Sequence, residues 1–120
     1  MYKVKVFGHF SGAHNLRGYK GKCEELHGHN WKVEVAASSE KLDDLGMVID
    51  FTELKKSLKA CLSGLDHKYL NDIEYFKDNN PTSENMAKYI FDRVSEIRKD
   101  VKIDSVTVWE TETSSATYSA

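Results

Sequence analysis

Residues 23 to 30 read CEELHGHN and gather one thiol and two imidazoles within a few positions. His27 and His29 are two residues apart, and on an extended chain such residues point to the same side. Two imidazoles on one strand face can hold one metal ion. An isolated H-x-H also occurs on polar surfaces, so this spacing needs a further ligand before it indicates a metal site.

His14 is the best candidate for that ligand, because it ends the first strand region in FSGAH. An antiparallel neighbour that contains HGH would bring His14 alongside. Three histidines leave the fourth position of a tetrahedral ion open, which is typical of a catalytic site. His9, in FGHF, is a rival ligand, although its setting is that of an ordinary strand histidine.

Cys23 admits more than one role beside these histidines. It could be a fourth metal ligand, a general base or a nucleophile. A thiol reacts as its thiolate, and a nearby metal ion or imidazolium lowers a thiol pKa. A site closed by Cys23 would indicate a structural zinc module, whereas an open site would indicate an enzyme.

Two acidic positions could also take part in chemistry. LDHKYLN places Asp66 next to His67, and an Asp that orients a His is part of the arrangement that activates a cysteine. Taken alone, the pair is better explained as a polar helix end. Glu110 ends the strand VTVWE and could accept two parallel N–H bonds from a heterocycle. A solvated strand end explains Glu110 equally well.

Strands and helices in the order ββααββ must position these side chains. YKVKV and WKVEVAA alternate and predict two strands, with a long loop over residues 14–26 between them. IDSVTVWE and SSATYSA predict a third and a fourth strand. This order predicts an α+β domain, with a four-stranded antiparallel sheet and two helices on one face. The predicted inward strand residues are Tyr2, Val4, Val6, Trp31, Val33 and Val35.

Two apolar stripes at helical spacing predict the helices. Pro81 is expected in the first turn of the second helix, and Glu84 near its positive end. The stripe of the first helix is Phe51, Leu54, Leu58, Leu62 and Leu65, and that of the second is Met86, Ile90, Val94 and Ile97.

Length and composition limit the possible functions. One domain over residues 1–120 is expected, and the net charge of −2 argues against a general nucleic-acid binder. The sequence contains no apolar run of membrane-spanning length and no signal-peptide pattern at its start. A cytoplasmic location is therefore expected, where Cys23 and Cys61 stay reduced. No phosphate loop or dinucleotide fingerprint is present, which predicts that no nucleotide cofactor is used.

Six segments together resemble the 6-pyruvoyl-tetrahydropterin synthase family in order and spacing: FSGAH, CEELHGHNW, GMVIDFTELK, LDHKYLN, NPTSEN and VWETETSSATY. They cover nearly the whole chain. The gap of three residues between Cys23 and HGH is similar in length to that of the 6-carboxytetrahydropterin-forming branch, which serves queuosine and other deazapurines. The pyruvoyl-forming branch usually has a longer gap. Gly12 departs from the family pattern, where alanine or serine is common.

The resemblance implies the tunnelling fold, assembled into an oligomeric barrel that is usually a homohexamer of two stacked trimers. It implies a pterin substrate, 7,8-dihydroneopterin triphosphate, bound at a subunit interface. It also implies a set of site residues: Zn²⁺ on His14, His27 and His29, Cys23 as general base, His67 with Asp66 behind it as proton relay, Glu110 as pterin anchor, and Thr82 and Ser83 near the pterin.

The implied reaction eliminates triphosphate and reduces the pterin ring by a redox-neutral rearrangement. In the carboxy branch, side-chain cleavage then releases acetaldehyde. Arg17, Lys20 and Lys22 could meet the triphosphate, although surface solvation explains them equally well. One alternative is a different pterin enzyme, either a 6-pyruvoyl-tetrahydropterin synthase, which does not cleave the side chain, or an aldolase-like side-chain lyase. The other is a structural zinc-binding module.

Overall fold

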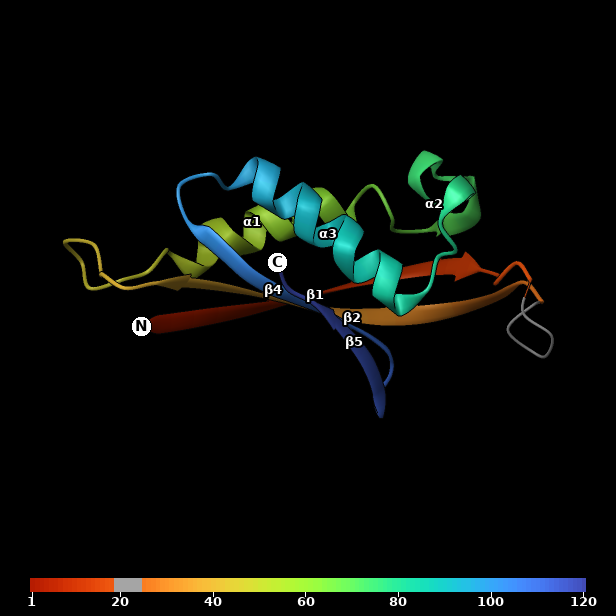
Figure 1. Ribbon diagram of the computed structural model, residues 1–120, viewed down its shortest axis with the longest axis horizontal. Helices are drawn as coiled ribbons and strands as arrows, with labels where there is room; N and C mark the ends of the chain where they lie inside the picture. Colours follow the sequence, from red (N-terminus) through yellow and green to blue (C-terminus); the bar gives the residue numbers. More distant parts are fainter. Residues whose placement is uncertain (19–24) are drawn as a thin grey trace.

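The computed structural model describes residues 1–18 and 25–120 of the chain. Its elements follow one another as β1 (Tyr2–His14), β2 (His27–Ser39), α1 (Phe51–Leu62), β3 (Lys68–Tyr69), the 3₁₀ turn η2 (Leu70–Asp72), α2 (Glu74–Asp78), α3 (Ser83–Ile97), β4 (Lys102–Thr111) and β5 (Ser114–Tyr118). Figure 1 shows α1 and α3 side by side on one face of the sheet. The molecule is elongated, with principal extents of 52 × 24 × 22 Å.

The strands lie in the order β3-β1-β2-β4-β5. The last four of these pair antiparallel, and β1 and β2 stay in register from Tyr2 opposite Ser39 to His14 opposite His27. The predicted α+β sheet with helices on one face is therefore confirmed. The prediction of four wholly antiparallel strands is wrong at one edge, because β3 pairs parallel with β1. Because β3 has only two residues, the sequence could not show the alternating pattern that predicts a strand.

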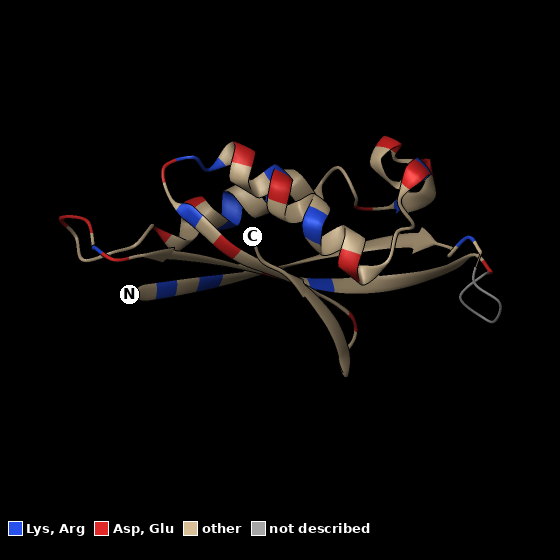
Figure 2. Ribbon diagram, viewed as in Figure 1, with Lys and Arg blue, Asp and Glu red and all other residues tan. Residues whose placement is uncertain are grey.

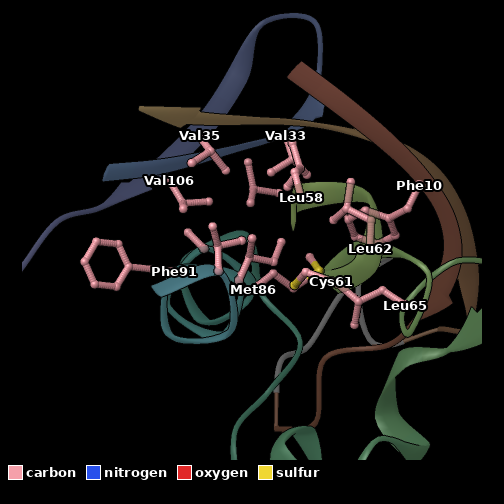
Figure 3. Packing of buried hydrophobic residues seen from close by; sticks show 14 of the residues in the cluster. Phe10, Val33, Val35, Leu58, Cys61, Leu62, Leu65, Met86, Phe91 and Val106 are labelled. Atoms are coloured by element: carbon pink, nitrogen blue, oxygen red, sulfur yellow. The ribbon is translucent and has the colours of Figure 1, made fainter. Parts of the chain in front are cut away.

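The core fills the space between the sheet and the two long helices, as Figure 3 shows. Val33, Val35 and Val106 of the sheet face Leu58 and Met86 of the helices, and all five side chains are buried. The predicted alternation along β2 is confirmed, since Trp31 belongs to the same buried cluster. Tyr2 was expected to point inward but is exposed, because it lies at the start of β1 beyond the helices.

Side-chain caps fix the starts of both long helices. Asp50 accepts a hydrogen bond from the Thr52 N–H before α1, and Thr82 accepts one from the Asn85 N–H before α3. Pro81 therefore precedes the cap of α3, and its prediction as a first-turn residue is wrong. The apolar stripes are buried except at the outer ends of the helices, where Phe51 and Ile97 are exposed.

Charges of both signs lie along α1 and α3 (Figure 2). On α3, Lys88 pairs with Asp92 at 2.8 Å and Arg93 with Glu96 at 2.9 Å. Such solvent-exposed pairs contribute about 1 kcal/mol or less to stability. The fold therefore depends mainly on the apolar contacts between helices and sheet. None of the helices in the described ranges is long and apolar enough to cross a membrane.

Candidate metal and substrate site

Three histidines converge where β1 ends and β2 begins. His14 lies opposite His27, and His29 lies opposite Gly12 in the same register. Because side chains alternate between the faces of a strand, His27 and His29 share the face of buried Trp31. The sheet thus places three imidazoles at one end of the layer that also forms the core.

The three rings are close enough to share one ion. The Nε2 atoms of His14 and His27 are 3.0 Å apart. One nitrogen from each of His14, His27 and His29 lies within 4.8 Å of the others. His14 is only 1% exposed, whereas the other two rings are partly exposed. The structure therefore brings together the three histidines that the sequence singled out.

Backbone carbonyls define the tautomers of two of these rings. His14 Nδ1 lies 2.7 Å from the Pro81 carbonyl oxygen, and His27 Nδ1 lies 2.7 Å from that of Glu25. A carbonyl oxygen only accepts hydrogen bonds, so each Nδ1 must carry the proton. The Nε2 atoms of both neutral rings therefore present lone pairs toward each other.

This arrangement fits a metal ion. Two facing lone pairs at 3.0 Å repel each other unless a cation lies between them. The Nε2 atom of His29 is buried and has no hydrogen-bond partner among the described residues. An ion bound by three imidazoles would satisfy all three atoms, and the two carbonyls would fix the rings as outer partners commonly do.

Burial also favours the neutral form of two of these rings, His14 and His29. Desolvation lowers the pKa of His14, and the Pro81 carbonyl opposes part of that shift. Desolvation likewise lowers the pKa of His29, against the attraction of the Glu110 carboxylate. A neutral imidazole is the form that binds metal. The site is thus prepared for a cation at neutral pH.

Trp31 forms the inner wall of the site. Its ring lies edge-on to His14 and His29, with centroids 5.0 and 5.1 Å away, and it stacks on Phe10 at 5.1 Å. The sequence predicted Trp31 only as a core residue. Its contacts show that it also restricts the orientation of two rings, and the register of β1 with β2 was needed to see this.

Glu110 lies beside the histidines. Its carboxylate is 3.5 Å from His29 Nε2, and its side chain is 31% exposed. It continues the strand face of buried Val106 and Val108, as predicted. An open hollow of about 440 Å³ also borders His29. His29 therefore joins the hollow to the Glu110 carboxylate, which lies beside the same ring.

Asp66 and His67 lie on the other edge of β1 from β2. Asp66 accepts the Ser11 N–H at 2.9 Å, and the His67 N–H donates to the Ser11 carbonyl at 2.6 Å. The second Asp66 oxygen is 3.7 Å from His67 Nε2, and the His67 side chain is 82% exposed. The structure joins this pair to each other but separates it by a strand from His29.

His67 also has an unusual backbone conformation, with φ at +56°. A residue with a Cβ is strained in this left-handed region, and such strain gathers at functional sites. The conformation lets the chain leave α1 and pair with β1 almost at once. A sequence offers no direct signal for it, since glycine and asparagine are the usual occupants of this region.

The start of α3 lies next to His14. Thr82 uses its hydroxyl oxygen to cap the helix, and Ser83 is the first helical residue. Pro81, immediately before them, presents its carbonyl to His14. Thr82 and Ser83 are therefore close in sequence to the group that orients one candidate ligand. The role of that carbonyl was not predicted, because a backbone oxygen has no side-chain signature.

Cys23, together with Lys20 and Lys22, lies outside the described residues. Arg17 lies within them, and its guanidinium donates to the carbonyl of Phe76, in the middle of α2. The other cysteine, Cys61, is buried in the core, which raises the pKa of its thiol to about 12. Cys61 therefore stays protonated and is no candidate nucleophile.

His9 is placed away from the triad. It borders an open hollow with Asn30, Lys32 and Trp109, on the sheet face opposite the helices. His9 and His14 are separated by an odd number of positions in β1, so their side chains fall on opposite faces of the sheet. The rival ligand set with His9 is wrong for the described part of the chain, where the metal-competent cluster consists of His14, His27 and His29.

Comparison with known proteins gives matches over nearly the whole chain. The sequence profile of the family described as 6-pyruvoyl tetrahydropterin synthase matches residues 3–120. A Synechocystis protein named 6-carboxy-5,6,7,8-tetrahydropterin synthase is 40% identical over 114 residues, covering 91% of this chain and 86% of that protein. A Haemophilus influenzae protein of the same name is 31% identical, covering 98% and 99%. The structure of Caenorhabditis elegans 6-pyruvoyl tetrahydropterin synthase aligns with a TM-score of 0.90 at 33% identity, covering 99% and 95%.

Proposed function

Because the chain belongs to the 6-pyruvoyl tetrahydropterin synthase family and is a lyase of that family, we propose that it is a zinc-dependent 6-carboxy-5,6,7,8-tetrahydropterin synthase. The proposed reaction converts 7,8-dihydroneopterin triphosphate to 6-carboxytetrahydropterin, acetaldehyde and triphosphate, as a step toward queuosine and related 7-deazapurines. The carboxy product is favoured by the name of the 40% identical relative and by the short spacing between Cys23 and HGH.

One observation carries the proposal. Three imidazoles with converging nitrogens and a carboxylate lie on one sheet face, and an open hollow borders one of them, His29. His14, His27 and His29 would hold zinc through Nε2. When bound, zinc supplies Lewis acidity that stabilises negative charge on substrate oxygens. Three protein ligands leave the fourth position for a substrate, whereas a structural zinc site is closed.

Glu110 is proposed to anchor the pterin ring. A pterin presents an amino group and a ring N–H side by side, and one carboxylate can accept both hydrogen bonds. Val108, next along the same strand face, is fully buried and excludes water from one side of the carboxylate. Thr82 and Ser83 are proposed to contact the pterin as well, because the carbonyl just before them orients His14.

Cys23 and His67 are proposed to move the protons. Cys23 would act as general base toward the substrate side chain, and His67 would exchange a proton on the other side. Asp66 can orient the His67 ring, because its other oxygen is held by the Ser11 N–H. Such a hydrogen bond fixes the carboxylate without using the oxygen that faces the imidazole.

The site is proposed to lie at a subunit interface of a homohexamer built from two stacked trimers. Two observations on the described residues support an assembled sheet. β5 has one neighbouring strand, and β1 pairs on its outer edge only at Gly12 and Ala13. Exposed strand edges of this kind are commonly covered by pairing with another chain. The exposed His67 ring at the edge of β1 suits a role across such an interface.

Product analysis tests the proposed reaction. The protein is incubated with 7,8-dihydroneopterin triphosphate, and the pterins and volatile aldehydes are identified. The proposal expects 6-carboxytetrahydropterin together with acetaldehyde in equal amounts. A pyruvoylpterin without acetaldehyde would instead assign the pyruvoyl reaction, which the likeness to the Caenorhabditis elegans structure makes the second candidate.

A cobalt-substituted sample tests the remaining alternative, a structural zinc module. Such a module would need a closed site with Cys23 on the metal. Thiolate ligation gives intense charge-transfer absorption, whereas three imidazoles and a solvent or substrate oxygen do not. The proposal expects no such absorption. Its presence, together with inactivity toward the pterin, would favour the structural module.

A further inference from the structure

The outer edge of the chain from Ser11 to Arg17 is covered largely by side chains. The peptide groups of Ser11 bond to Asp66 and His67, and those of Ala13 face β3. Beyond β3, the backbone of Asn15 and that of Arg17 each bond to the side chain of one asparagine. Alternate residues of an extended chain present their N–H and C=O to the same edge. Hydrogen bonding along this edge therefore continues past the last residue of β1, up to Arg17 in the following turn.

The two asparagines are Asn71 and Asn80, and together with the backbone of Asn15 and Arg17 they form what we call the amide clasp. Asn71 accepts the Asn15 N–H at 3.0 Å and donates to the Asn15 carbonyl at 2.9 Å. Asn80 does the same for Arg17, at 3.1 and 2.9 Å. A carboxamide offers one acceptor and donors side by side, so each asparagine replaces a residue of a neighbouring strand.

Asn80 is connected to His14 in two ways. Through Arg17 it holds the chain that directly follows His14. Through the peptide bond it is joined to Pro81, whose carbonyl accepts the hydrogen bond from His14 Nδ1. The Asn80 carbonyl also accepts the Thr82 N–H at 2.8 Å and the Asn85 side chain at 2.9 Å. The residues on both sides of Pro81 are thus fixed.

We propose that Asn80 is a positioning residue for the metal centre, which acts by holding the Pro81 carbonyl at the distance and direction that orient His14. The proposal rests on the metal site proposed above. The Asn80 side chain is not proposed as a ligand itself, because both its oxygen and its nitrogen bond to the Arg17 backbone. Asn71 would support it by holding Asn15, the residue between His14 and the second half of the clasp.

Zinc affinity of the full chain tests the proposal, with Asn80→Ala compared to Asn79→Ala. Asn79 is the matched control, because it is the adjacent residue and also donates one hydrogen bond to a backbone carbonyl, that of Tyr75 at 2.9 Å. Loss of a partner that orients a metal ligand typically weakens metal binding by about 10- to 100-fold. We expect a weakening of this size for Asn80→Ala and about twofold or less for Asn79→Ala.

The unfolding midpoint of each metal-free variant is measured in parallel. Wild-type protein that binds no zinc would overturn the metal site and the proposed function with it. Wild-type affinity in Asn80→Ala, or an equal loss in Asn79→Ala, would overturn the positioning role alone. The two failures are therefore distinguishable, and neither depends on enzymatic activity.

A double-mutant cycle separates positioning from general destabilisation. In a His14→Ala background the ring that the Pro81 carbonyl orients is absent. Adding Asn80→Ala should then change the remaining zinc affinity by no more than about twofold, because the ring through which Asn80 acts is already gone, whereas an independent effect would add in full. A further loss as large as in wild type would overturn the proposal.

A second variant keeps the test possible should Asn80→Ala not fold. Asn80→Asp retains the acceptor for the Arg17 N–H but loses the donor to its carbonyl. Asn79→Asp adds the same charge one residue away and serves as the control. We expect Asn80→Asp to bind zinc about tenfold more weakly than Asn79→Asp. Equal affinities in the two aspartate variants would overturn the positioning role.

Discussion

The Nε2 atoms of His14 and His27 lie 3.0 Å apart, and each ring donates a hydrogen bond from Nδ1 to a backbone carbonyl. The two facing nitrogens therefore carry lone pairs and no proton between them. A cation removes the repulsion and gains two ligands that need no rearrangement. Metal binding should consequently be tight, and metal removal should cost the protein stability.

The first prediction concerns metal content. Purified protein should hold about one zinc per chain, as a single tetrahedral site implies. Removing zinc with a chelator should lower the melting temperature, because a ligand present at about 1,000 times its dissociation constant stabilises the folded state by about 4 kcal/mol. Metal analysis and calorimetry measure both effects.

Single histidine variants locate that ion. His27→Ala or His29→Ala should remove most of the zinc, whereas His9→Ala should retain it, because His9 lies on the opposite sheet face. Full zinc occupancy in the double variant that lacks His27 and His29 would contradict the assignment.

The second prediction concerns pH in the metal-free protein. Burial holds the pKa of folded His14 below its ordinary value of 6.5, so the unfolded chain takes up the proton first. The free energy of unfolding should fall as the pH is lowered below about 6.5, and continue to fall until the folded pKa is reached. Urea titrations between pH 5 and 8 measure this. A His14→Gln variant should show a shallower dependence, and an unchanged dependence would assign the effect to other groups.

The third prediction separates two features of His67. Its φ of +56° costs a residue with a Cβ about 1 kcal/mol or more, which glycine avoids. His67→Gly should therefore be more stable to urea than His67→Ala by about 1 kcal/mol. Both variants should lose about 100-fold or more in turnover, because both remove the proposed proton donor. Equal turnover in wild type and His67→Ala would exclude His67 from the chemistry.

Much of the fold could be predicted because its long elements have clear periods. Val33 and Val35 alternate along β2, and Leu54 and Leu58 repeat along α1, so the sequence shows which faces are buried. The short elements β3 and α2 have too few residues to show a period. They form because β1 and the chain after α1 meet, which is a property of the tertiary structure.

The candidate site also has features that the sequence could predict and features that it could not. His27 and His29 could be paired from their spacing alone, and His14 from its place in the opposite strand. The carbonyls of Pro81 and Glu25 could not, because every residue has one and only the fold selects which lies near an imidazole. The separation of His67 from the triad also depends on the order of strands, which residue spacing does not contain.

The fourth prediction concerns Cys23. As a general base and not a ligand, it can be removed without loss of the metal. Cys23→Ala should keep about one zinc per chain and lose about 100-fold or more in turnover. Metal analysis and product formation from dihydroneopterin triphosphate measure the two quantities on the same sample. Loss of zinc from this variant would support the structural module instead.

The fifth prediction concerns Glu110. Its carboxylate lies 3.5 Å from His29 Nε2, at the end of a strand face that is otherwise apolar. Glu110→Gln replaces one acceptor oxygen by an amide donor, which would face an N–H of the pterin ring. We expect pterin affinity to fall by about 2 kcal/mol, the scale for a buried polar group left without its partner. Zinc content should stay the same, because three imidazoles suffice to hold the ion.

Glu112→Gln is the matched control for this change. Glu112 is exposed and borders the hollow on the opposite sheet face, with His9 and Lys32. The same chemical change there should alter pterin affinity by less than about 0.5 kcal/mol, as is usual for surface substitutions. Calorimetry with a pterin ligand on zinc-loaded protein compares the two variants. Wild-type affinity in Glu110→Gln, with a loss in Glu112→Gln, would place the pterin on the other face of the sheet.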